Sequence, residues 1–164
     1  MESLYYEVEQ AGAAKESKSQ EVIGKMENLL TQFSDGPQKQ RATLILADEL
    51  YNTHAYDRAI GLYKDIIQET SPANLPYQLA SVGVAYSLEG KKDYKGAIVA
   101  YKTIIESQMG FPLFHVYLSL ARCYELNEDD NGALLTLREM KTKFSGHAKI
   151  ELVGSRLKKL EAPA

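Results

Sequence analysis

The sequence contains one cysteine, no tryptophan and no long hydrophobic run. The single cysteine, Cys123, excludes an internal disulfide and a cysteine metal cluster, and its apolar helical surroundings favour a buried structural thiol. No stretch approaches the roughly eighteen consecutive apolar residues of a membrane span, so we expect no membrane insertion within this chain. Residues 1–7 lack the basic and apolar regions of a signal peptide. The protein is therefore cytoplasmic, or any export or anchoring segment lies outside this chain.

A strong charge imbalance is also missing. The formal net charge is -3 and the sequence pI is about 5.7. A chain this close to neutral has no strong attraction to phosphate backbones, so we do not expect nucleic acid as a partner. With 45% hydrophobic and 25% charged residues, the 164-residue chain has the composition of a folded globular protein. Its length suits one domain with a sizeable core.

Motifs for catalysis and metal binding are absent as well. The three histidines lie far apart in the sequence, and none has a partner at ligand spacing, so no metal site is predicted. Asp129-Asp130 and Glu125-x-x-Glu128 lack the residue order of an EF-hand, and a helix cap and a solvated turn explain them better. No Gly-rich phosphate loop, nucleophile elbow or HExxH motif occurs. We therefore predict no catalytic residue, no cofactor and no enzymatic activity.

What the sequence does contain is a repeated segment. In three places a small residue is followed four positions later by a large apolar one, and the leading alanines are 38 and 36 residues apart. Self-similarity near this period is typical of stacked helical hairpins, which bury their apolar faces against neighbouring repeats. The segments are 59–63, 97–101 and 133–137, and three prolines occur in step with them, Pro37, Pro76 and Pro112.

Apolar residues at spacings of three and four predict an all-α domain over residues 1–164, with no strand. Three hairpins are clear, and the turn of the second, 89–93, is expected to be about two residues longer than the others. A divergent hairpin precedes them, with Val22, Met26 and Leu29 on its inner face. A capping helix follows them, with Ile150, Val153, Leu157 and Leu160 inside. The ranges are 3–34 for the divergent hairpin (helices Leu4–Ala14 and Val22–Phe33), 38–71, 76–107 and 112–145 for the clear ones, and 147–161 for the cap.

Small and large residues in these hairpins carry a family resemblance. The third hairpin contains Tyr117-x-x-Leu120-Ala121-x-x-Tyr124 and Ala133-x-x-x-Leu137, and the second contains Gly83-x-x-Tyr86-x-x-x-Gly90 and Tyr94-x-x-Ala97-x-x-x-Tyr101. These residues resemble the tetratricopeptide repeat, in which small residues let paired helices approach each other. The resemblance is clear over 38–146 and implies a right-handed superhelical stack of antiparallel hairpins. Two departures are the missing tryptophan and the alanines, Ala47 and Ala121, at the glycine position of the first helix. Gly83 matches that position only if the second turn is longer.

The resemblance also implies a concave groove lined by the first helix of each hairpin. A known clamp for acidic C-terminal peptides, made of lysine and asparagine, is absent, because Leu44 with Asp48 and Leu118 with Arg122 stand at its places. A groove of mixed aromatic and charged residues still suits an extended segment or a helix. The groove positions implied by the resemblance are Arg41, Asp48, Tyr51 and Asn52, then Tyr77 and Ser87, then His115, Arg122 and Glu125.

The layout is further similar to bacterial envelope proteins in which a tetratricopeptide domain follows an N-terminal membrane anchor. This group includes the ancillary subunit of the Sec translocon. Residues 118–125 (LSLARCYE) and Arg156-Leu157-x-x-Leu160 carry the similarity. It implies the periplasmic face of a membrane, with the anchor absent from this chain, and a cytoplasmic location is the alternative.

Two hypotheses about function follow. In the first, the protein is a non-catalytic adaptor that binds a peptide segment or a partner protein in the groove. In the second, it is a self-assembling unit of an envelope complex, with terminal helices pairing between copies because Leu4, Tyr5 and Val8 are poorly covered in the first hairpin.

Overall fold

The computed structural model describes residues 19–107 and 112–162. Over these ranges the chain forms eight helices and no strand, as the apolar periodicity predicts. The first half of the divergent hairpin, Leu4–Ala14, lies outside the described residues. The helices are 19–30, α2 (Pro37–Asn52), α3 (Tyr56–Glu69), α4 (Leu75–Gly90), α5 (Tyr94–Glu106), α6 (Phe114–Leu126), α7 (Asp130–Lys143) and α8 (Ile150–Glu161).

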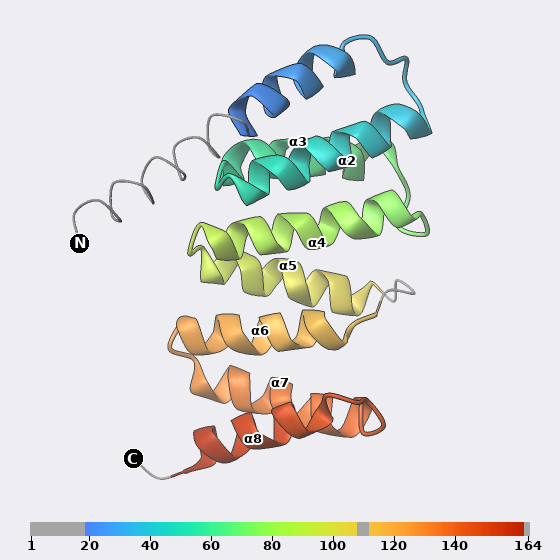
Figure 1. Ribbon diagram of the computed structural model, residues 1–164. Helices are drawn as coiled ribbons and strands as arrows, with labels where there is room; N and C mark the ends of the chain where they lie inside the picture. Colours follow the sequence, from blue (N-terminus) through green and yellow to red (C-terminus); the bar gives the residue numbers. More distant parts are fainter. Residues whose placement is uncertain (1–18, 108–111, 163–164) are drawn as a thin grey trace, which may run out of the picture.

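The helices stack in chain order, with the helix 19–30 at one end and α8 at the other (Figure 1). From α2 to α8, each helix packs against the next, and α2 also contacts α4. The turns inside the hairpins lie along one side of the stack, and the link between α3 and α4 lies along the other (Figure 1). Because the apolar faces meet neighbouring helices only, the core is distributed along the stack in three clusters of buried side chains.

The three turns inside the hairpins have the same length and the same backbone geometry. In each turn the N–H of the third residue donates to the carbonyl five residues earlier, at 2.8–2.9 Å. This bond, with a left-handed residue at the centre of the turn, is the Schellman ending of a helix. The expectation of a longer second turn is therefore wrong, because α4 continues to Gly90 before the same ending occurs. The turns are 53–55, 91–93 and 127–129, centred on His54 (φ 61°), Lys92 (φ 64°) and Glu128 (φ 59°).

Alignment on these turns changes the position of the small residue in the second hairpin. Ala47 and Ala121 each lie seven residues before the centre of their turn, and Ala85 lies at the same distance from Lys92. All three alanines have no exposed surface. The assignment of Gly83 to this position is therefore wrong by two residues. The longer period comes from its helices: α3 and α4 together have four residues more than α5 and α6, and the link before α4 is two residues shorter than the link before α6.

The second helices carry the repeated segments in the predicted way. Their leading alanines are fully buried, and the large residues four positions later are at most 2% exposed. Aspartate caps the last two of these helices: the side chain of Asp93 accepts from the N–H of Gly96 at 3.0 Å, and Asp129 accepts from Gly132 at 2.8 Å. The residues buried here are Ala59 and Tyr63, Ala97 and Tyr101, and Ala133 and Leu137.

The two ends of the stack differ in how well the pattern predicted them. In α8, Val153 and Leu157 are buried, and Ile150 and Leu160 pack on the same cluster, as expected of the capping helix. In the helix 19–30 the predicted inner face is right for Met26 and wrong for Val22 and Leu29. Val22 is 46% exposed and Leu29 53%, whereas Ile23 is buried, with Met26 and Leu30 packed beside it. In the described part of the chain, we find no helix long and apolar enough to cross a membrane.

Candidate functional site

Two adjoining cavities lie on the side of the stack formed by the first helices. The α2–α4 cavity has a volume of about 400 Å³, and the α4–α6 cavity about 480 Å³. Tyr51 and Tyr86 line both, so the two cavities form one continuous surface, here called the groove. The α2–α4 cavity is also lined by Leu44, Asp48, Asn52, Tyr63, Leu79, Val82 and Gly83, and the α4–α6 cavity by Glu89, Gly90, Lys92, Tyr94, Arg122 and Leu126.

The structure brings together four of the nine residues implied by the resemblance. Asp48, Tyr51 and Asn52 line the α2–α4 cavity, and Arg122 lines the α4–α6 cavity together with Tyr51. Glu125 lies on the same helix as Arg122 but lines neither cavity. Arg41 and His115 are exposed on α2 and α6 and line neither cavity.

The two residues implied from the second hairpin do not belong to the groove. Ser87 is fully buried, and Tyr77 packs against the core cluster of α4, α5 and α6. Both errors come from the two-residue shift that the expected longer turn introduced. In the register of the structure, Leu79 and Glu89 occupy the places assigned to Tyr77 and Ser87, and both line the groove. The hydroxyl of Ser87 has no hydrogen-bond partner among the described residues.

Sequence reasoning therefore missed Leu79, Tyr86 and Glu89. By its place in the repeat motif Tyr86 is expected in the core, and it does pack on Tyr101 with ring centroids 5.9 Å apart. The signal that finds all three is their distance from the turn. Tyr86 lies six residues before Lys92, as Asp48 and Arg122 lie six residues before the centres of their own turns.

The floor of the α2–α4 cavity is a tyrosine bonded to a carboxylate. Tyr63, only 2% exposed, donates from its hydroxyl to Oδ1 of Asp48 at 2.5 Å. Burial, together with this hydrogen bond, raises the pKa of Tyr63 above its usual range, so the phenol is neutral. The Tyr63 ring lies against the backbone of Gly83, where a Cβ would come within 2.6 Å of Cε1. A glycine at this position allows Tyr63 to reach Asp48.

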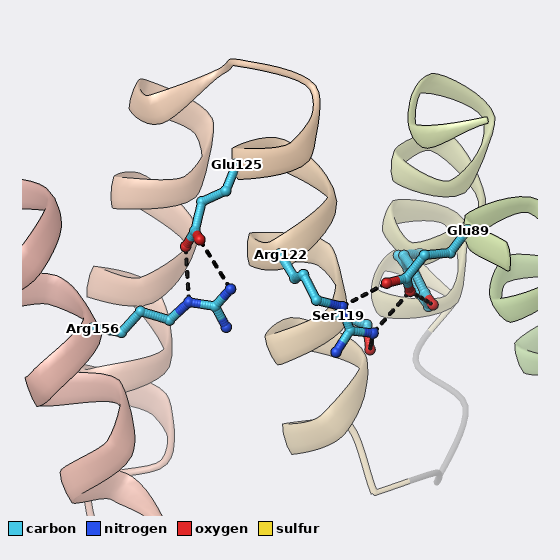
Figure 2. Close-up of polar contacts among 6 residues, drawn as sticks. Glu89, Ser119, Arg122, Glu125 and Arg156 are labelled. Carbon is cyan, nitrogen blue, oxygen red and sulfur yellow. Dashed lines mark hydrogen bonds and ion pairs between the residues drawn. The ribbon is translucent and has the colours of Figure 1, made fainter. Parts of the chain in front are cut away.

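Two arginine–glutamate pairs, here called the ladder, join α4 to α6 and α6 to α8. Arg122 on α6 donates to both carboxylate oxygens of Glu89 on α4, at 2.5 and 2.9 Å. Arg156 on α8 donates in the same bidentate way to Glu125 on α6, at 2.8 and 3.0 Å (Figure 2). Such paired bonds fix the geometry of both groups. The hydrogen bonds to Glu89 raise the pKa of Arg122, so this arginine stays charged and paired. The ladder therefore positions neighbouring helices and neutralises the charges along this part of the groove.

Loss of Arg122 should destabilise the protein more than loss of an exposed arginine. Glu89 is only 14% exposed, and Arg122→Ala leaves it with the hydroxyl of Tyr101 at 2.9 Å as its remaining partner. We expect a loss of about 1–2 kcal/mol in the free energy of unfolding, measured by chemical denaturation. The matched control is Arg138→Ala, whose ion pair with Glu161 is 56% and 44% exposed and should contribute about 0–1 kcal/mol. Equal losses in both variants would contradict a structural role for the ladder.

The described residues offer no activated nucleophile at Cys123. Its side chain is fully buried, and burial raises the pKa of the thiol to about 12. A thiol with this pKa stays protonated near neutral pH, which agrees with the structural role expected from the sequence. Over the described ranges, no three His, Cys, Asp or Glu side chains converge as metal ligands.

No protein-family model and no curated protein matches the chain. The described helices and their packing therefore carry the argument about function alone.

Proposed function

We propose that this protein is a non-catalytic helical-repeat module of the tetratricopeptide type that binds a peptide segment or helix of a partner protein in the groove. The observation that carries the proposal is the continuity of the two cavities through Tyr51 and Tyr86. Side chains from α2, α4 and α6 line one surface, and apolar and aromatic groups there alternate with charges. Such a surface suits an extended segment or an amphipathic helix. The right-handed superhelix and the periplasmic location belong to the same proposal, on the resemblance described above.

Three features support binding here over binding on the second helices. Tyrosines supply large contact area with little loss of rotamer freedom, and Tyr51 and Tyr86, which are partly exposed, line both cavities. Leu79 is 42% exposed although it is apolar, so a partner would bury surface that now contacts water. The ladder holds α4, α6 and α8 in fixed relation, so the groove is formed before a partner binds, which lowers the entropy lost on binding.

The test is a selection of random peptides about twelve residues long on the full chain, followed by binding measurements. Leu79→Glu introduces a charge into the α2–α4 cavity and should weaken the selected peptides by about tenfold or more. The matched control is Val99→Glu, an equally apolar but 65% exposed position on α5 that lines neither cavity. This control should bind within about twofold of the wild type. Peptides that bind Leu79→Glu as well as wild type would overturn the proposal.

Self-assembly remains the second hypothesis. It depends on Leu4, Tyr5 and Val8, which lie outside the described residues. Light scattering over a range of concentrations tests it, because a strict monomer at every concentration would rule it out.

A further inference from the structure

The charges that line the groove differ between its two cavities. In the α2–α4 cavity, the charge has no counterion among the described residues. Among the described residues, Asp48 is the single acidic or basic side chain that lines that cavity. It is exposed and forms no ion pair with any of the described residues. Its Oδ1 accepts from Tyr63, whereas Oδ2 accepts no hydrogen bond from the part of the chain that the structure describes. The positions three and four residues away on α2 are Leu44, Ile45, Tyr51 and Asn52, so no basic side chain of its own helix reaches it.

The other charges of the groove are arranged differently. In the α4–α6 cavity Glu89 and Arg122 neutralise each other through the ladder, and Lys92 remains as the unpaired charge among the lining residues. Asp48 lines only the first cavity and Lys92 only the second. The groove therefore has a negative end at α2 and a positive end beside the α4–α5 turn.

The aromatic lining of the α2–α4 cavity favours a basic ligand group, as the carboxylate of Asp48 does. Tyr51 and Tyr86 border the cavity that Asp48 faces, and aromatic faces attract cations by about 0.5–1 kcal/mol at exposed sites. Lysine and arginine also have long apolar stems that can cover aromatic surface while the charge remains at the carboxylate. An acidic ligand group would instead face Asp48 without compensation.

We propose that the segment bound in the groove presents a lysine or arginine whose stem lies on Tyr51 and Tyr86 and whose charge pairs with Asp48. This inference rests on the proposed function and specifies the chemistry of the partner. It also sets where the charges of the segment lie along the groove. The basic side chain lies at the α2 end, and an acidic or neutral residue faces Lys92.

The experiment uses the peptides selected on the full wild-type chain and a second selection on Asp48→Lys. Wild-type peptides should share a lysine or arginine at one position, and replacing it with glutamine should weaken binding about tenfold. Asp48→Asn should weaken binding of the selected peptides by a similar factor. For the peptide in which glutamine replaces the basic residue, Asp48→Asn should weaken binding no further, because both changes remove the same ion pair. Asp48→Lys should select peptides with aspartate or glutamate at that position. The loss on Asp48→Asn should shrink at high salt, as expected of a partly exposed ion pair.

Two controls keep the result interpretable. Asparagine at position 48 retains an oxygen that can accept from Tyr63, so the thermal midpoint of Asp48→Asn should stay close to that of the wild type. Asp65→Asn removes another exposed aspartate, on α3, that lines neither cavity, and its binding should be within about twofold of the wild type.

The possible failures are distinguishable. Peptides that depend on Leu79 but carry no basic residue, with unchanged binding to Asp48→Asn, would overturn this inference and leave the proposed function standing. Equal losses in Asp48→Asn and Asp65→Asn would show an effect of net charge and would also overturn it. If no selected peptide depends on Leu79, both the inference and the proposed function fall.

Discussion

Ala121→Leu is expected to lower the free energy of unfolding by about 1–3 kcal/mol, because a larger side chain at this position overpacks a helix crossing. Ala121 has no exposed surface and lies in the cluster that joins α6, α7 and α8. The three further carbons of leucine, one methine and two methyl groups, would have to displace neighbours such as Leu137 or Met140, which are themselves fully buried. Denaturation in urea, followed by circular dichroism, measures the change.

Ala85→Leu should have an effect of the same size, since Ala85 occupies the equivalent position of the second hairpin. The control is Ala73→Leu, an exposed position in the link between α3 and α4, where we expect a change within about 0.5 kcal/mol. An unchanged midpoint for both Ala121→Leu and Ala85→Leu would contradict the register of the second and third hairpins.

Gly83→Ala and Gly61→Ala are expected to change stability in opposite directions. The new Cβ at Gly83 would overlap the ring of Tyr63, which is buried and bonded to Asp48. Displacing this ring should lower the free energy of unfolding by about 1–3 kcal/mol. At Gly61, in the middle of α3, no atom outside its chain neighbours and the backbone of its own helix lies within 4 Å of the position of a Cβ. Alanine there should raise stability by about 0.5–1 kcal/mol, because glycine loses more backbone entropy on folding.

The pair of variants also separates packing from helix propensity. If propensity alone decided, both substitutions would stabilise the protein. Tyr63→Leu provides a further check, because it removes the phenol that clashes with the new methyl group. In that background, Gly83→Ala should lose most of its destabilising effect, a coupling that a double-mutant cycle measures. Independent, additive losses would contradict the contact between Gly83 and Tyr63.

Much of the helical layout could be predicted from the sequence because the signals are local. The spacing of Ala59 and Tyr63, and of their equivalents, marks the buried face of each second helix within a few residues of chain. Asp129, which caps α7 by accepting from the N–H of Gly132, marks the start of that helix. This signal is also local, since a cap involves only residues close together in the chain. The inner face of the helix 19–30 was predicted correctly for Met26 but not for Val22 and Leu29, because the orientation of this helix depends on its contacts with α2 and α3, which are distant in sequence.

The groove was harder to predict, because its residues meet only across helices. A two-residue error in the second turn was enough to put Ser87 and Tyr77 in place of Glu89 and Leu79. Helix positions two residues apart point about 200° apart around the axis, so such an error moves a residue from the surface into the core. The residue in the left-handed conformation after α4 is Lys92. A glycine at this position would predict the end of the helix, whereas a lysine does not.

The sequence by itself determined the helical class, the order of the helices from α2 to α8, and the alanines that begin the buried face of each second helix. Each of these depends on residues close together in the chain, where periodicity and capping act directly. Only the tertiary structure decided that Arg122 pairs with Glu89 and that Arg156 pairs with Glu125. It also decided that Asp48 has no basic partner among the described residues. These pairings join residues more than thirty positions apart. Charge and burial at such positions depend on which helix lies beside them, and contacts between segments distant in sequence set that arrangement.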